Sequence, residues 1–285
     1  MQGRVCLVTG ANRGIGKATA LGLAELGARV VLICRDRNQG ESATTEIRSE
    51  SGNDAVELLL ADLSSQGSIR QLVQDITNGY PQVHVLVNNA GLFRTKRHET
   101  EGGIELTLAV NYLAPFLLTN LLIDTLKAGR PSRIVNVAGD YHRKGTIDFE
   151  DLMCEKDYSG SKANNQAKLA LVLFTYEMAR RLAGIGVTVN CLHPGAVATD
   201  GIQSDPDISA GMLTLYRFMK LFFATPKKGA ETSIYLASSP DVEGVTGKYF
   251  IKKKEVASSP ESYDESIAKQ LWEVSEGLTG MAYRE

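Results

Sequence analysis

The stretch that decides the fold is Thr9-Gly10-Ala11-Asn12-Arg13-Gly14-Ile15-Gly16, which lies between an apolar run at 4–8 and a segment of helical periodicity at 15–26. Glycines allow a tight turn and let another group approach the backbone closely. The helix N-terminus that follows would offer free N–H groups and a favourable dipole to a pyrophosphate. A glycine triplet alone is a weak signal, but its place between strand and helix favours a dinucleotide site over a structural turn.

Strand and helix alternate along the rest of the chain. Strands are predicted at 4–8, 29–33, 55–60, 83–87, 133–137, 187–192 and 248–251, and helices at 15–26, 39–50, 66–78, 104–127, 164–182 and 230–237. These strands are apolar along their length, without alternating polar residues. Such strands are typical of a parallel sheet that is covered on both faces. We therefore expect an α/β fold, a Rossmann-type doubly wound seven-stranded parallel sheet with helices on both faces, in a single domain over 1–285.

Two segments, 139–163 and 194–226, interrupt this alternation. Long loops in a compact domain are usually functional. The second segment carries an apolar stripe of helical spacing, which fits either core packing or a substrate lid; we expect a lid over about 194–226. The helices at 104–127 and 164–182 are apolar nearly all round. They are expected to pack on the sheet, and a homodimer through them is the alternative that the sequence leaves open.

Composition excludes several classes of protein. The formal net charge is −2 and the pI about 6.2, so no basic field for a nucleic acid exists. No apolar run approaches the ~20 residues of a transmembrane segment. The four cysteines are scattered without metal-ligand spacing, which indicates reduced thiols, no metal and a cytoplasmic protein. The run 252–254 of three lysines is interpreted as a solvated surface loop.

The end of the second strand indicates which cofactor binds. An NAD site places an acidic residue there for the ribose hydroxyl, whereas NADP needs cations for its 2′-phosphate. Arg35 takes the discriminating place and Arg13 of the glycine loop supplies a second cation. Two guanidinium groups suit recognition of one phosphate, so the sequence favours NADP(H).

The chain resembles the short-chain dehydrogenase/reductase family over nearly its whole length, and is similar to the retinol-dehydrogenase-like branch. The resemblance rests on Thr9–Gly16, Asp62-Leu63, Asn88-Asn89-Ala90-Gly91, Asn111 and His193-Pro194-Gly195 through Thr199, together with phrases such as Cys34-Arg35-Asp36, Lys168-Leu169-Ala170 and Gly247-Lys248-Tyr249-Phe250. It implies cofactor contacts by Gly10, Asn12, Arg13, Gly14, Ile15, Gly16, Arg35, Asp62, Leu63, Asn89, Ala90, Gly91, Lys168, Pro194, Gly195, Val197 and Thr199.

The same resemblance implies that two catalytic groups are missing. Family members use a Ser, a Tyr, a Lys four residues after the Tyr, and an Asn that orders water. The phenol protonates the developing alkoxide while hydride passes between nicotinamide and carbonyl carbon, and the Ser donates to the same oxygen. Here Lys168 and Asn111 are retained, whereas Gly139 holds the Ser place and Asn164 the Tyr place.

Tyr158 and Lys162 match the family's Tyr-x-x-x-Lys pattern and compete with the register of Asn164 and Lys168. Everything after Lys168 matches the family without a gap, so choosing Lys162 would need a six-residue insertion within one helix. Six residues are ~9 Å of helical rise, so Lys162 could not present its amine where Lys168 does. We therefore assign Lys168 to the family's lysine place, with Tyr158 and Lys162 as the competing pair.

We expect a replacement for the missing proton donor among the residues that follow the fifth strand. Asn164 can donate a hydrogen bond but cannot deliver a proton near neutral pH. Tyr141 is the candidate, with Asp140 beside it to orient it; His142 and His193 fit structural roles in their loops better, and Cys154 and Tyr158 are weaker candidates.

Three functions follow from these residues. The first is an atypical NADP(H)-dependent oxidoreductase acting on a small apolar carbonyl or alcohol, with Asn111, Lys168, Asn164 and Tyr141 as its candidate catalytic residues. The second is a repurposed enzyme of a non-redox step, namely cyclisation, isomerisation or elimination. The third is a catalytically silent NADP(H)-binding protein.

Overall fold

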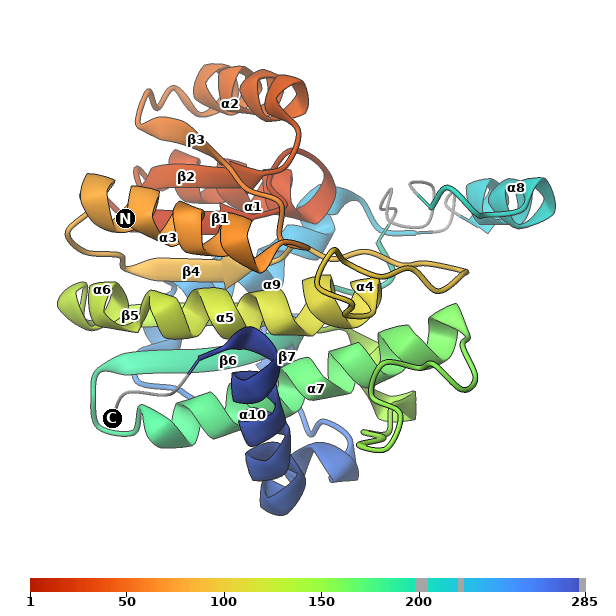
Figure 1. Cartoon of the computed structure of the whole chain (residues 1–285). Coiled ribbons are helices and arrows are strands. Elements are labelled where there is room, and N and C mark those ends of the chain that lie inside the picture. Colours follow the sequence, from red (N-terminus) through yellow and green to blue (C-terminus); the bar gives the residue numbers. More distant parts are fainter. Residues whose placement is uncertain (198–204, 220–222, 282–285) are drawn as a thin grey trace.

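The fold is built on one mixed sheet. The computed structural model describes residues 1–197, 205–219 and 223–281. Its eight strands lie in the order β3-β2-β1-β4-β5-β6-β7-β8 (Figure 1). They are β1 (Val5–Thr9), β2 (Arg29–Cys34), β3 (Val56–Leu60), β4 (Val85–Asn88), β5 (Ser132–Val137), β6 (Val187–His193), β7 (Tyr249–Ile251) and β8 (Lys254–Glu255). The order reverses between β1 and β4, where doubly wound folds place their ligand outside the carboxyl ends of the strands.

The seven strands predicted from the sequence are confirmed, each within two residues of its predicted bounds, and they pair in parallel. The prediction of seven strands and of an all-parallel sheet was wrong at its edge, because β8 pairs antiparallel with β7. Lys252 and Lys253 form the intervening turn with φ of 51° and 65°. Such hairpin turns normally use Asn or Gly, so two lysines give no hairpin signal in the sequence, and the expected surface loop at 252–254 is instead the turn and the first residue of β8.

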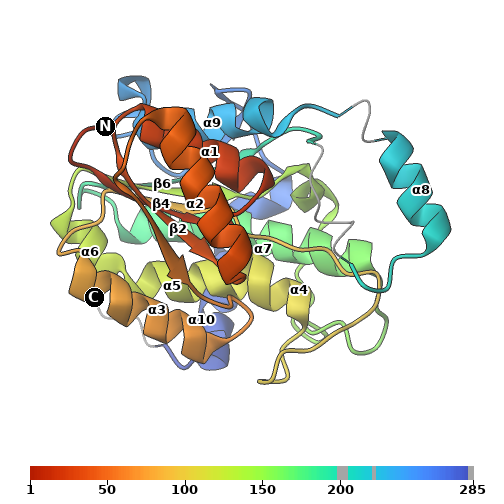
Figure 2. The same cartoon turned by 90° about the horizontal axis from the view of Figure 1, so that it is seen from above.

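Helices cover both faces of the sheet, as predicted (Figure 2). The helices α1 (Gly14–Glu25), α2 (Arg37–Ser51) and α9 (Pro226–Ser238) lie on one face. On the other lie α3 (Gln66–Gly79), α5 (Ala114–Leu121), α7 (Gly160–Arg181) and α10 (Glu265–Thr279). The strands are buried on both sides, which is why their sequences are apolar without alternation.

The helix predicted at 104–127 is not continuous. It divides into α4 (Leu106–Leu108), a π-helical turn at Ala109–Leu113, α5 and α6 (Ile123–Ala128). Pro115 has no N–H for the carbonyl of Asn111, so the regular ladder is interrupted at this point. π-Helical turns within α-helices are frequent at functional sites. The turn contains Asn111, one of the predicted site residues.

The C-terminal helix α10 was not predicted, and it covers α5 and α7. The Trp272 ring lies 5.0 Å from the ring of Phe116 and 5.9 Å from that of Phe174. The hydroxyl groups of Tyr112 and Ser275 are 2.6 Å apart. The apolar side chains that suggested a homodimer are thus buried within the chain itself. Nothing in the described structure now favours a homodimer through 104–127 and 164–182, and it stays an untested prediction.

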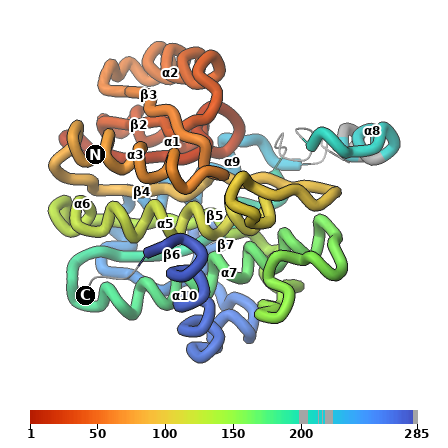
Figure 3. Tube along the Cα trace, in the orientation of Figure 1, coloured from red at the N-terminus to blue at the C-terminus, as the bar shows by residue number. Residues whose placement is uncertain are grey.

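The segment predicted as a lid contains α8 (Ala210–Met219), in agreement with its helical spacing. This helix projects beyond the carboxyl ends of the strands, away from the other helices (Figures 1 and 3). Residues 198–204 and 220–222 of the same segment lie outside the described residues. Within the described ranges, no helix has both the length and the apolar character needed to cross a membrane.

Candidate active site

The glycine loop joins β1 to α1 and is held by the end of β4. The Thr9 hydroxyl oxygen accepts hydrogen bonds from the backbone N–H groups of Asn89 (2.9 Å) and Ala90 (3.0 Å). The Asn89 amide donates to the Thr9 carbonyl at 2.8 Å. A side chain on Gly10 would come within 2.9 Å of Ala90 Cα, and one on Gly16 would collide with the Gly10 carbonyl. The glycines at these two positions are therefore a packing requirement.

The N-terminus of α1 is left open for an anion. Its first residue is preceded by Arg13, whose side chain makes no capping hydrogen bond. In contrast, the helices α2, α3, α7, α9 and α10 are each capped by a side chain, from Asp36, Ser65, Ser159, Thr225 and Asp264 respectively. Nothing lies within 4 Å of a Cβ placed on Gly14. Uncapped N–H groups behind an open glycine loop fit a pyrophosphate.

The cations predicted to select NADP(H) lie at the rim of this loop. Arg13 and Arg35 are both exposed, and Arg35 Nη1 is 3.9 Å from Asp62 Oδ2. The neighbouring Asp36 carboxylate accepts from the backbone N–H of Gln39 at 2.8 Å, so it caps α2. The Asn12 amide donates to Gln39 at 2.7 Å. The acidic residue that follows Arg35 in the chain thus caps its own helix.

The segment after β6 lies against α1 and α9. The buried side chains of Ile15, Val197 and Ala230 pack together in one cluster. Gly195 has φ of 90°, which only glycine adopts readily, and it follows Pro194 directly. Thr199 falls outside the described residues. On the other side of the glycine loop, Asp62 and Leu63 line a pocket of about 610 Å³ between the start of α3 and α5.

Lys168, Asn111 and Asn164 meet at the carboxyl ends of β4 and β5. Asn111 Nδ2 donates to Asn164 Oδ1 at 3.3 Å and to the Leu92 carbonyl at 2.9 Å, while its Oδ1 accepts from the Leu92 N–H at 2.8 Å. Lys168 Nζ donates to the Val137 carbonyl at 3.0 Å. A Cβ on Gly91 would lie 3.3 Å from Asn111 Oδ1 and 3.7 Å from Lys168 Nζ. Burial lowers the pKa of Lys168 to about 8.

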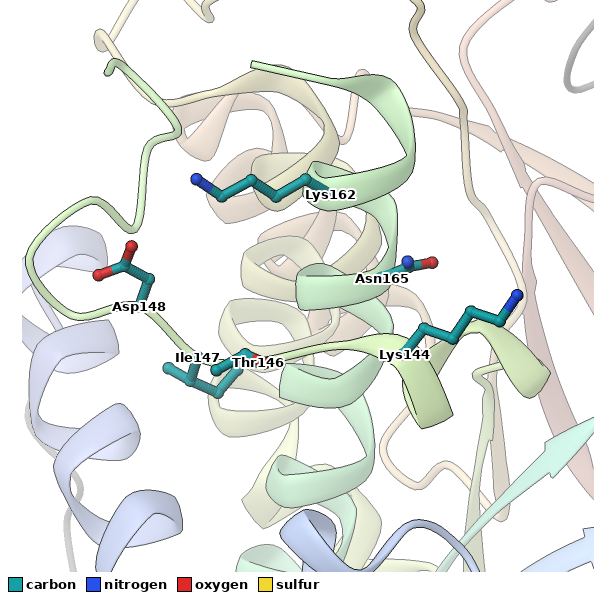
Figure 4. A pocket seen from close by; sticks show the side chains of 6 residues that line it. All are labelled: Lys144, Thr146, Ile147, Asp148, Lys162 and Asn165. Carbon is teal, nitrogen blue, oxygen red and sulfur yellow. The ribbon is translucent and has the colours of Figure 1, made fainter. Parts of the chain in front are cut away.

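Tyr158 and Lys162, the competing pair, lie elsewhere. Tyr158 precedes α7 and its hydroxyl donates to the Arg94 carbonyl at 3.1 Å; burial raises its pKa to about 12. Lys162 Nζ is 3.8 Å from Asp151 Oδ2. Figure 4 shows the Lys162 side chain leaving α7 on the side of Asp148, in a pocket of about 540 Å³ that Ile147 lines together with polar residues. Of the two lysines, it is Lys168 that lies beside Asn111 and Gly91.

Gly139, in the serine place, has a backbone conformation that is nearly exclusive to glycine. Its φ is 101° and its ψ 170°. The N–H groups of Ala138 and Gly139 both donate to the Leu192 carbonyl at 3.0 Å, so the end of β5 bulges. The Gly139 carbonyl accepts from His142 Nδ1 at 2.8 Å and from the Tyr249 hydroxyl at 3.3 Å.

The candidates for a replacement acid differ in their surroundings. Tyr141 is 58% exposed, and its ring lies beside Gly139. His142 is fully buried and uses both nitrogens, because Nε2 accepts from the Ser259 N–H at 3.2 Å. The Cys154 thiol is also buried, and Gln166 donates to it. A structural role therefore suits His142, as predicted.

A buried polar network beneath the site was missed at the sequence level. Asn88 Nδ2 donates to Asn136 Oδ1 at 2.8 Å, and Asn136 Nδ2 donates to Thr175 Oγ1 at 2.9 Å. The network joins β4 and β5 to α7, the helix that carries Lys168. Thr9 and Asn88 were noted only as members of motifs, and their hydrogen-bonding roles were not predicted. The available signal was polar residues within otherwise apolar strands and helices, since buried polar groups are almost always hydrogen-bonded.

The fold and the glycine loop define a doubly wound α/β protein of the dinucleotide-binding class. Residues 4–207 match the family model described as short chain dehydrogenase, and the chain belongs to that family.

Its relatives include retinol dehydrogenases. Retinol dehydrogenase 14 of Mus musculus is 45% identical over 292 residues, covering 99% of this chain and 87% of the relative. Among solved structures, a putative uncharacterized protein from Mycobacterium paratuberculosis matches with a TM-score of 0.79 at 29% identity, covering 100% and 96% of the two chains. The RhlG/NADP active-site complex of Pseudomonas aeruginosa matches with a TM-score of 0.68 at 25% identity, covering 88% and 94%.

Proposed function

We propose that this protein is an NADP(H)-dependent oxidoreductase that acts on a small apolar alcohol or carbonyl compound and exchanges its proton through a group other than the family's tyrosine. The observation that carries the proposal is the cluster of Lys168, Asn111 and Asn164 around Gly91, next to an intact glycine loop. The names of the retinol dehydrogenase relatives support an apolar alcohol or aldehyde as substrate.

The fit of the cofactor rests on the open α1 N-terminus and on the two glycines that admit no side chain. The pyrophosphate would lie against the glycine loop, the 2′-phosphate between Arg13 and Arg35, and the nicotinamide end near Lys168 and the segment from Pro194 to Val197. When bound, the cofactor supplies or accepts a hydride. The NADP complex of a structural relative supports the choice of NADP(H).

The chain's own residues would then position the substrate and hold charge. Lys168 is charged at pH 7 even with a pKa of about 8, so its ammonium favours a negatively charged substrate oxygen. Asn111 fixes the Asn164 amide, which can hydrogen-bond a substrate but not exchange a proton. Proton exchange is assigned to the surroundings of Gly139, where Tyr141 lies. Four buried, free cysteines support a reducing, cytoplasmic setting.

A specific observation favours the second candidate, a non-redox enzyme. Gly139 is held in its glycine-only conformation by hydrogen bonds to both its N–H and its carbonyl. A serine could not be restored there without strain, so the departure from the family's chemistry is built into the backbone. A silent NADP(H)-binding protein is the third candidate, and the assay below separates all three.

The test combines binding and turnover. NADPH binding is measured by calorimetry, and consumption of reduced nicotinamide is followed with a panel of apolar aldehydes and ketones that includes retinal. Binding with turnover is the expected result. Binding with product formed but no change in nicotinamide absorbance would replace the proposal by the non-redox enzyme. Binding with neither would leave a silent protein, and turnover that appears only in the Gly139→Ser/Asn164→Tyr variant would show that the redox chemistry has been abandoned.

A further inference from the structure

The place of the missing serine is lined by a second polar side chain, that of His193. A Cβ built on Gly139 would lie 3.9 Å from Tyr141 Cδ2 and 4.0 Å from His193 Nδ1. His193 is the last residue of β6, directly before Pro194 of the expected nicotinamide segment. Its side chain therefore lies between the end of β5 and that segment.

His193 Nδ1 is a buried nitrogen that has no hydrogen-bond partner among the described residues. The other three histidines of the chain each use a ring nitrogen. His142 bonds through both nitrogens, His84 Nδ1 accepts from the Val5 N–H at 3.0 Å, and His98 Nε2 is 2.5 Å from Asp207. A buried polar atom without a partner is costly, because it has lost its hydrogen bonds to water. Such an atom needs a partner, and at the edge of an active site a substrate atom can supply it in place of a water.

We propose that His193 Nδ1 binds the oxygen of the alcohol or carbonyl substrate and exchanges the proton of the reaction; this rests on the proposed function and names its acid–base residue. In oxidation, Nδ1 would accept the alcohol O–H proton while the carbon loses its hydride to a bound oxidised nicotinamide, so that the C–O bond becomes a carbonyl. The imidazolium would then release its proton to water. In reduction, the imidazolium would donate its proton to the carbonyl oxygen as the carbon takes up a hydride from the reduced nicotinamide.

The charges around His193 suit a base. Burial lowers the pKa of His193, the Asp140 carboxylate raises it, and the Arg143 guanidinium lowers it. Asp140 and Arg143 belong to a 3₁₀ turn at Asp140–Lys144. The further titratable groups at this place are His142 of that turn and Tyr249 of β7, whose ring centroids are 4.8 Å apart. Neutral imidazole is thus the resting form at pH 7, ready to accept a proton. The nearby Asp140 stabilises the imidazolium that forms.

Tyr141, the candidate proton donor from the sequence, is less well shielded from water than His193 Nδ1. More than half of its side chain is exposed, so its hydroxyl competes with water for any partner, whereas His193 Nδ1 is shielded. Tyr141 and His193 both lie beside the Cβ position of Gly139, so substituting each in turn compares their roles directly. We therefore assign the proton transfer to His193, and Tyr141 would only line the substrate site.

The first experiment measures NADP⁺-dependent oxidation of cinnamyl alcohol across pH. Asparagine reproduces the position of Nδ1 but cannot transfer a proton near neutrality. His193→Asn is therefore expected to lower kcat by about 10²–10⁴-fold, with a smaller change in KM, and to remove the rise of kcat with pH that reports the imidazole. His84→Asn, at the amino end of the central strand β4, controls for the loss of a histidine. An unchanged kcat and pH profile in His193→Asn, or a larger loss of kcat in Tyr141→Phe, would overturn the assignment.

A second readout does not depend on turnover. In ¹⁵N-histidine spectra of the wild-type chain with NADP⁺, cinnamyl alcohol is expected to shift the Nδ1 resonance of His193, assigned through His193→Asn. No shift would mean that the nitrogen holds only a buried water, and this would overturn the binding role. If the wild type binds NADPH but oxidises no alcohol, the proposed function and the proton-transfer role both fail, and the shift decides separately whether the oxygen site exists.

Discussion

Replacing Gly139 by alanine tests the interpretation of the serine place. At φ 101° and ψ 170° a residue other than glycine stores about 1–3 kcal/mol of strain. The added carbon itself meets only ordinary contacts, at 3.9 and 4.0 Å, so no steric term is added. The alanine also restricts the unfolded chain, which returns about 0.4–1 kcal/mol. We expect a net loss of about 1–2 kcal/mol in the free energy of unfolding.

Urea denaturation of the wild type and Gly139→Ala measures this loss. The matched control is Gly277→Ala on the exposed side of α10, where the backbone is helical and nothing lies within 4 Å. The control should gain about 0.5–1 kcal/mol. If Gly139→Ala were as stable as the wild type while the control behaved as expected, the backbone at this position would not require glycine. The argument that a restored serine is strained would then be refuted.

Three further predictions concern the cofactor rim, the lysine and the C-terminal helix. Arg35→Ala should weaken NADPH binding by about 10–100-fold, since a hydrogen bond to a charged group is worth about 1.5–3 kcal/mol, and leave NADH binding unchanged; equal effects on both in calorimetry would contradict this role. Because burial lowers the pKa of Lys168 from 10.5 to about 8, the unfolded chain binds that proton more tightly. Wild-type stability should therefore rise with pH between about 8 and 10.5 relative to Lys168→Met, and parallel urea midpoints across that range would contradict it. Trp272→Ala should cost about 3–5 kcal/mol by leaving a cavity against Phe116 and Phe174, and a thermal midpoint near that of the wild type would show that α10 contributes little.

Most of the sheet and the cofactor end could be predicted from the sequence because both leave local signals. Strands buried on two faces are uniformly apolar, and a glycine that touches backbone, as Gly16 does, tolerates no alternative. The elements that were missed lack such signals. The turn before β8 uses two lysines where Asn-Gly is usual. The break at Asn111 depends on one proline within an otherwise helical apolar pattern.

The catalytic end was harder to predict because it depends on long-range geometry. The sequence offered two registers for the family's lysine, Lys162 after Tyr158 and Lys168 after Asn164, and the structure places Lys168, not Lys162, beside Asn111 and Gly91. The roles of these residues stay predictions. Sequence patterns also could not show that Gly139 has a glycine-only conformation or that His193 Nδ1 is unpaired. Both facts arise from the packing of β5 and the turn after it against β6, which begins 50 positions after β5 ends.

The position of α10 has a consequence for how the protein behaves on dilution. A surface covered by a second subunit opens when the concentration falls below the dissociation constant. Here the cover is tethered to the same polypeptide, so its effective concentration is fixed by the linker and does not depend on how much protein is present. The part of the α5 and α7 surface that α10 packs on therefore stays covered at any protein concentration.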